Sequence, residues 1–119
     1  MRTLEDHKVN PANDTLIIAV VDEPGHGGAN HQYVIESGDF PNMLRIEFQN
    51  GPINKVGVNG VTHEALLAIL CDRMRGFQAG PYACADNGEA LEHMEKAQIA
   101  LQRRTRERMA RDVEGTHAV

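Results

Sequence analysis

The sequence lacks the features on which disulfide-bonded, metal-stabilised and membrane-spanning proteins depend. Its 119 residues include no tryptophan, three Phe, two Tyr and two cysteines, Cys71 and Cys84. Two cysteines at this spacing form neither a disulfide framework nor a zinc motif. No apolar run approaches the roughly 18 residues of a membrane helix, and the charged N-terminal segment excludes a secretory signal. These absences favour a reducing cytoplasm.

Positive charge is scarce along most of the chain. The formal net charge is -5, which argues against a general nucleic-acid binder, since such proteins present a basic face. Residues 1–102 contain seven Lys or Arg and fourteen acidic residues, whereas residues 103–119 contain five Arg and three acidic residues. The basic charge is therefore concentrated between Arg103 and Arg111, in a chain whose length indicates a single domain.

The first half of the chain alternates short apolar runs with turn residues, which is typical of strands. Residues 15–21 are nearly all apolar, so they indicate a strand covered on both faces. A period of two follows, and its apolar positions are Tyr33, Ile35, Leu44, Ile46 and Phe48. This pattern predicts an antiparallel sheet with one wet or ligand-facing side. We expect residues 15–61 to form the sheet and residues 1–14 to be flexible.

The segment 50–60 is rich in glycine and asparagine and interrupts the apolar pattern. A glycine-rich loop can cradle phosphate, but this one lacks the Lys-Ser/Thr ending of a P-loop and the spacing of a dinucleotide fingerprint. We interpret it as a turn and short strand that lead into the first helix.

The second half of the chain predicts two helices. The first covers residues 62–76, with Thr62 as N-cap and a stop at Gly76. The second covers residues 86–111, where Asp86 with Glu89 three residues later resembles a capping box. The short linker makes the helices antiparallel neighbours, and residues 112–119 form a tail. The sequence thus predicts an α+β fold, an N-terminal antiparallel sheet followed by a C-terminal antiparallel two-helix hairpin.

The second predicted helix carries an apolar stripe that continues into arginines. The stripe consists of Ala90, Met94, Ala97 and Leu101, and the same spacing leads to Arg104 and Arg108. An arginine on a packing face needs an anionic partner, which is either an acidic residue of the protein or a bound anion. The alternative is that these arginines are solvated and favour the dipole at the helix C-terminus.

Two of the five aromatic residues, Phe77 and Tyr82, lie in the expected linker between the helices. A ring near an arginine-rich helix can stack a nucleobase, while guanidinium groups bind phosphates. If Asp86 caps the helix, the amide of Asn87 is free to read an adenine edge. The alternative is that Asn87 is itself the cap and that Phe77 packs against the sheet.

Catalytic motifs are weak by comparison. The six histidines are scattered, without an HExxH pattern, so no metal site is expected. His26 and His31, in or beside a glycine-rich loop, are candidates for acid–base chemistry. Neither a GxSxG motif nor a plausible cysteine nucleophile is present. We therefore expect no catalytic residues and no cofactor.

Several segments together resemble the phage Thoeris anti-defence protein one family. They are FQNGPI (Phe48 to Ile53), GVNGV (Gly57 to Val61), EALLAI, FQAGPYAC and the C-terminal pattern ALxxxEKAxxxLxxRTRERxARxVEGTH. The resemblance covers about residues 15–117, and the anti-CBASS protein two sponges are more distant relatives. One departure is Asp112, where the family pattern has glycine.

The resemblance implies a non-enzymatic sponge in the cytoplasm of the infected bacterial host. Such a sponge sequesters glyco-cyclic ADP-ribose made by TIR-domain proteins, and hexameric members also bind cyclic di- or trinucleotides. It further implies a dimer or a trimer of dimers. By the same resemblance, Phe77 stacks adenine, Asn87 hydrogen-bonds the base or ribose, and Arg104 and Arg108 bind the pyrophosphate. Further candidates for ligand contacts are Tyr82, Arg103, Asn59 and His117.

Two other functions remain open on the sequence alone. One is a small phosphodiesterase that cleaves such a cyclic nucleotide. The other is an arginine-helix module that binds RNA or a partner protein, for which binding that depends strongly on salt is the signature.

Overall fold

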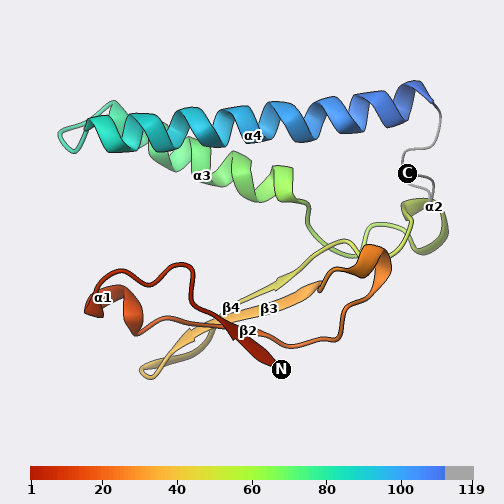
Figure 1. The fold of residues 1–119 in the computed structure, drawn as a ribbon, viewed down its shortest axis with the longest axis horizontal. Helices are drawn as coiled ribbons and strands as arrows, with labels where there is room; N and C mark the ends of the chain where they lie inside the picture. Colours follow the sequence, from red (N-terminus) through yellow and green to blue (C-terminus); the bar gives the residue numbers. More distant parts are fainter. Residues whose placement is uncertain (112–119) are drawn as a thin grey trace. The chain divides into compact units, whose positions relative to one another are not determined.

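The computed structural model describes residues 1–111, with the side chains of Asn13 and His26 excepted. It confirms an α+β fold in which an antiparallel sheet precedes two long helices (Figure 1). The chain forms two compact units, one covering Met1–Val61 and the other beginning at Thr62. The single domain expected from the chain length stays a prediction. None of the described helices combines the length and the apolar composition that crossing a bilayer requires.

Four strands form the sheet of the first unit, and all neighbouring strands are antiparallel. Their order in the sheet is their order along the chain: β1 (Arg2–Leu4), β2 (Ile17–Val20), β3 (Gln32–Ser37) and β4 (Phe40–Glu47). Residues 1–14 include β1, which pairs with β2, and a short helix, α1 (Pro11–Asp14), while their expected flexibility stays a prediction. A strand of three residues is too short for periodicity to reveal.

The register places the alternating apolar residues on one face of the sheet, as the period of two predicts. Tyr33 lies opposite Ile46, and Ile35 lies opposite Leu44. Val20 pairs with Tyr33 on the same face and is only 1% exposed. The buried residues of the other face are Ala19 and Val34. Strand β2 therefore has buried side chains on both faces, which its continuous apolar run predicts.

The loop between β2 and β3, which contains the 3-10 helix η1 (His26–Gly28), is held by the carboxylate of Asp22. Asp22 Oδ2 accepts a hydrogen bond from the backbone N of His31 at 2.9 Å, and Oδ1 accepts one from the backbone N of Gln32 at 3.2 Å. Burial raises the pKa of Asp22, but the hydrogen bonds outweigh burial and hold the pKa below its ordinary value. The loop is thus fixed by an ionised carboxylate.

The segment 50–60 forms a one-turn helix, α2 (Ile53–Val56), where the sequence predicted a short strand. The reason is a pair of hydrogen bonds that closes the loop. Asn59 Nδ2 donates to the carbonyl of Asn50 at 2.8 Å, and Asn59 Oδ1 accepts from the backbone N of Asn50 at 2.8 Å. The amide side chain of Asn59 thus replaces the strand ladder expected there.

Helix α3 (His63–Gln78) begins where the sequence predicts. Thr62 Oγ1 accepts a hydrogen bond from the backbone N of Ala65 at 3.1 Å, which confirms Thr62 as the N-cap. The predicted end at Gly76 is wrong, because Gly76 stays helical and α3 continues for two more residues. Phe77 therefore lies on the last turn of the helix and not in the linker.

Helix α4 (Ala85–Ala110) begins without the predicted cap. Its N-cap is Cys84 and not Asp86, and the reason is a contact with the end of α3. The side chain of Gln78 donates to the carbonyl of Cys84 at 3.0 Å and accepts from its backbone N at 3.1 Å. These two bonds close the turn between the helices and set the start of α4.

The two helices pack along a seam with heptad spacing. In α4 one line of buried and half-buried residues recurs at intervals of three and four: Leu91, Met94, Gln98, Leu101, Thr105 and Arg108. In α3 the buried residue is Cys71, which is 3% exposed. Gln98 Nε2 donates across the seam to the carbonyl of Glu64 at 3.0 Å. Arg75 pairs with Glu95 at 2.9 Å, and this hydrogen bond raises the pKa of Arg75.

The apolar stripe predicted for this helix is rotated slightly from the observed packing side. Met94 and Leu101 lie on that side, but Ala97 is exposed. Small alanines fit several positions of an amphipathic pattern, so they do not fix its phase. The consequence concerns the two arginines that continue the stripe. Arg108 is buried, 6% exposed, whereas Arg104 is exposed.

Candidate functional site

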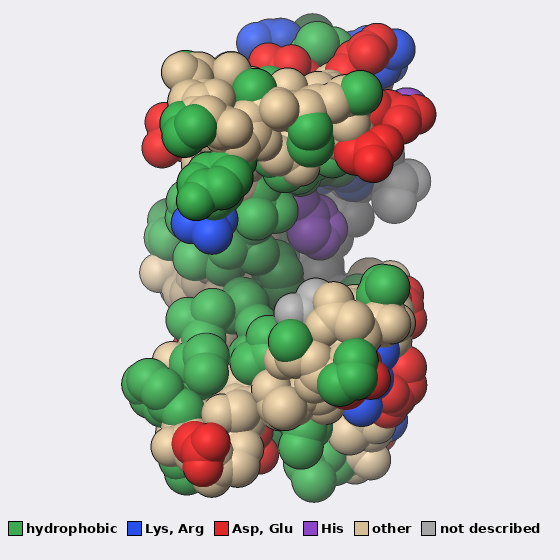
Figure 2. Space-filling model, turned by 90° about the vertical axis from the view of Figure 1, so that its left-hand side faces the viewer, with side chains coloured by type: hydrophobic (Ala, Val, Ile, Leu, Met, Phe, Trp, Pro, Cys, Tyr) green, Lys and Arg blue, Asp and Glu red, His purple; other side chains and the backbone are tan. Residues whose placement is uncertain are grey.

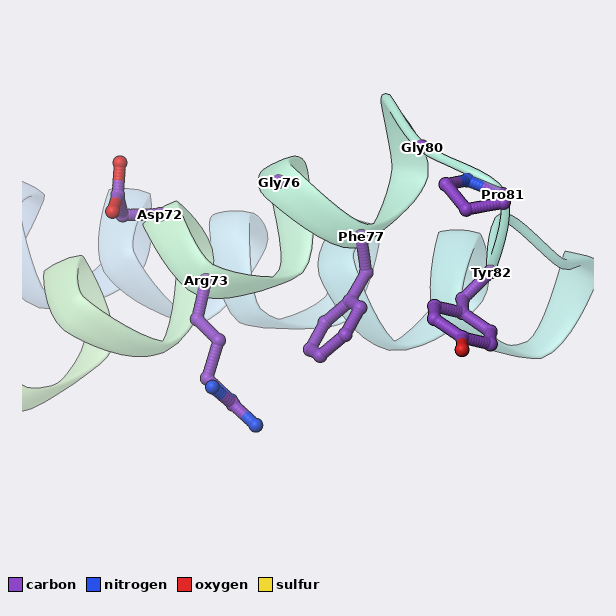
Figure 3. A pocket seen from close by; sticks show the side chains of 7 residues that line it. All are labelled: Asp72, Arg73, Gly76, Phe77, Gly80, Pro81 and Tyr82. Atoms are coloured by element: carbon purple, nitrogen blue, oxygen red, sulfur yellow. The ribbon is translucent and has the colours of Figure 1, made fainter.

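A pocket of about 460 Å³ lies at the turn between α3 and α4. Its lining residues come from the last two turns of α3 and from the linker (Figure 3): Asp72, Arg73, Gly76, Phe77, Gly80, Pro81 and Tyr82. This volume falls within the range of about 300–1,000 Å³ typical of small-molecule sites. The pocket is built entirely from the second unit.

Two aromatic rings lie next to each other in this pocket. The ring centroids of Phe77 and Tyr82 are 6.5 Å apart, and the ring planes are inclined by 72°. Phe77 is half-buried, and Tyr82 is 74% exposed. Rings exposed on a pocket wall offer a flat apolar surface on which a nucleobase can stack. The structure therefore brings together the two aromatic residues that the sequence singled out.

Arg73, which no sequence pattern singled out, lies on the opposite side of Phe77 from Tyr82 (Figure 3). Its guanidinium carbon is 4.9 Å from the centroid of the Phe77 ring, which is within cation–π distance. Figure 3 shows Arg73, Phe77 and Tyr82 in a row with their side chains pointing the same way, while Asp72 points to the opposite side. The spacing of four residues between Arg73 and Phe77 was the signal available in the sequence.

Asn87 lies on the first turn of α4, close to the pocket. Its Nδ2 donates to the carbonyl of Tyr82 at 3.4 Å, which uses one of the hydrogen-bonding groups of the amide. Asn87 does not cap the helix, because Cys84 does, and its predicted contact with a ligand stays a prediction. Asn87 instead connects the start of α4 to the residue that carries the exposed ring.

The arginines of α4 lie far from this pocket within one chain. Seventeen positions of unbroken helix separate Asn87 from Arg104, which at about 1.5 Å per residue corresponds to roughly 25 Å. Arg103 is exposed like Arg104. Arg108 lies one turn farther along the helix. The structure thus brings Phe77, Tyr82 and Asn87 together at one end of the hairpin and leaves the arginines toward the other end of α4.

The residues that line this pocket do not include Asn59 or His31. Asn59 belongs to the first unit, where its side chain closes its own loop. His31 is buried beside the loop that Asp22 holds. The side chain of His26 lies outside the described part of the chain, and so does His117, together with Asp112. Within residues 1–111, no three potential metal ligands cluster.

Comparison with known proteins assigns the chain to a family. Residues 42–106 match the model of a family described as Acb2/Tad1, hairpin domain. Over 110 aligned residues the chain is 38% identical to Thoeris anti-defense 1 of Bacillus phage SBSphiJ7. The alignment covers 92% of this chain and 75% of that protein. The chain belongs to the Thoeris anti-defence 1 family. It is a phage anti-defence protein, as the sequence motifs indicated.

The matched region of this Thoeris anti-defence 1 family member contains most of the candidate site. It begins in β4 and ends in the last part of α4, so it includes the pocket, Asn87 and Arg104. Arg108 lies two residues beyond its end but within the region aligned by identity, which covers 92% of the chain. The family assignment gives the anti-defence role, and the ligand is a separate question.

Proposed function

We propose that this protein sequesters, without cleaving it, the glyco-cyclic ADP-ribose signal that TIR proteins of the Thoeris system make in the infected host cell. Binding would keep the signal from its effector. The observation that carries the proposal is the aromatic wall of Phe77 and Tyr82 in a pocket of about 460 Å³. Adenine has a flat π-face that fits such a wall, and the family's anti-defence role supplies the reason to bind a signal.

The ligand also has two phosphates, and the candidate groups for them are Arg104 and Arg108. In one chain these arginines are roughly 25 Å or more from the aromatic wall, by the helix rise. That separation is much longer than a small cyclic nucleotide. We infer that the complete site is shared by two chains, in which the Phe77 end of one hairpin lies beside the arginine end of its partner.

The surface of α3 supports pairing with a second copy. Leu66, Leu70 and Phe77 lie at helical spacing along one side of the helix, and Leu70 is 47% exposed. Ile69, next to this side, is 64% exposed. Figure 2 shows hydrophobic side chains exposed over the helices as well as over the sheet. In a two-fold dimer the same patch meets itself, and antiparallel hairpins place opposite ends together.

The free energy that a sponge needs favours a shared site. A nanomolar dissociation constant corresponds to about -12 kcal/mol. One stacked base contributes about 1–3 kcal/mol, and each charge-assisted arginine contact contributes about 1.5–3 kcal/mol. These contacts account for only part of the total. Enclosure between two chains excludes water and holds the binding groups in place, which supplies the remainder.

The test is to saturate the protein with glyco-cyclic ADP-ribose, remove free ligand, denature the complex by heat and analyse the released molecule. We expect intact cyclic ligand in stoichiometric amount, because the proposal includes no bond cleavage. A ring-opened product would show a phosphodiesterase and contradict the proposal. Absence of released ligand, together with a salt-dependent mobility shift of oligonucleotides, would favour the RNA-binding alternative.

A further inference from the structure

Arg73 differs from the neighbouring arginine on the same helix in what it contacts. Arg75 is paired with the carboxylate of Glu95 at 2.9 Å. Arg73 makes no ion pair among the described residues, and its guanidinium lies 4.9 Å from the Phe77 centroid. Contact with a ring face orients a guanidinium without using up its hydrogen-bond donors. Arg73 therefore keeps those donors available at the pocket.

The direction of the side chains sets where a ligand's charge would lie. Arg73, Phe77 and Tyr82 form a row with a cationic end and an aromatic end (Figure 3). The carboxylate of Asp72 points to the opposite side. A nucleotide whose base stacks at the aromatic end would place a phosphate toward the cationic end. Planar guanidinium groups bind phosphate oxygens in bidentate fashion.

We propose that Arg73 is a ligand-binding residue that contacts a phosphate of the nucleotide whose base stacks on the aromatic wall. This inference rests on the proposed function and deepens it. The pocket of one chain would then recognise both base and phosphate, and the arginines of the partner chain would complete the enclosure. The pocket would discriminate against nucleosides, which carry a base and no phosphate.

The test compares Arg73→Gln with the matched variant Arg75→Gln, using glyco-cyclic ADP-ribose and adenosine as probes. Arg73→Gln is expected to weaken binding of glyco-cyclic ADP-ribose by roughly 10- to 100-fold, the range for loss of one charge-assisted contact. Adenosine binding, followed by NMR titration, should change less than about twofold by the same reasoning. Arg73→Lys should restore part of the affinity, since it keeps the charge without the planar donors. Arg75→Gln should leave both affinities unchanged.

Three other results would contradict the role of Arg73 or the proposed function. If Arg73→Gln weakens the binding of both probes equally, Arg73 only holds the Phe77 ring in position, and the inference is overturned. Unchanged affinity for glyco-cyclic ADP-ribose in Arg73→Gln also overturns it, while the proposed function stands. If the unmodified protein binds neither probe, the proposed function fails, and this inference fails with it.

Discussion

Phe77→Ala is expected to weaken binding of glyco-cyclic ADP-ribose by roughly 10- to 100-fold, because stacking of a base on an aromatic ring contributes about 1–3 kcal/mol. The loss has a second source. The Phe77 ring orients the guanidinium of Arg73, which lies 4.9 Å from the ring centroid. Removing the ring releases that side chain as well. Isothermal titration calorimetry of the purified variant measures the effect.

The matched control for this change is Phe40→Ala. Phe40 is exposed on β4 in the other unit and is not among the residues that line the pocket, so it undergoes the same chemical change outside the candidate site. The affinity of the Phe40→Ala variant for the ligand should equal that of the unmodified protein. Circular dichroism and light scattering establish that both variants keep their fold and assembly. A Phe77→Ala protein that keeps its fold and binds within about twofold of the original would remove Phe77 from the site, given the stacking energies above.

Arg104→Glu is expected to weaken binding by about 100-fold or more, since it removes a charge-assisted contact to a phosphate and adds a repulsive charge. Arg104 is exposed on α4 and has no ion-pair partner among the described residues, so its replacement should not disturb the hairpin. Arg108 is a less suitable position, because its side chain is buried. A carboxylate there would affect stability as well as binding.

The control for Arg104→Glu is Arg106→Glu, which makes the same change in charge two residues along the same exposed stretch of α4. Residues two apart on a helix project in nearly opposite directions. We expect Arg106→Glu to bind like the unmodified protein at moderate salt. An equal loss in both variants would mean that the helix attracts the ligand only through its overall charge, and Arg104 would then have no specific contact.

Local patterns in the sequence were sufficient where a single element determines the structure. The period of two at Tyr33 and Ile35 fixed which residues share a face of the sheet. Thr62 has the side chain and the position of an N-cap, and the structure confirms it. These features depend on residues that are close in the chain, so the sequence alone could predict them.

The ends of the helices at the pocket depend on contacts between elements. Gly76 is compatible with a helix end, but α3 continues to Gln78, whose side chain then binds Cys84 and sets the start of α4. Capping patterns around Asp86 contain no information about that contact. The prediction of a linker position for Phe77 failed for this reason, although its place in the site stays a prediction.

The composition of the candidate site was only partly accessible from the sequence. Spacing along α4 suggested that Arg104 and Arg108 continue a packing stripe, but alanines at positions 90 and 97 left its phase undetermined. The separation between the aromatic wall and the arginines follows from the length of α4. It becomes evident only once α4 is known to be unbroken and Phe77 is placed at its N-terminal end.

The shared site is the central claim, and mixed assemblies of the Phe77→Ala and Arg104→Glu chains test it most directly. The two variants are co-expressed with different tags, and assemblies that contain both are purified and titrated with glyco-cyclic ADP-ribose. In a mixed two-fold dimer, one site contains both changes and the other contains neither. We predict close to the original affinity at half the original number of sites. Mixed dimers that bind no better than either variant alone would contradict a site shared between chains.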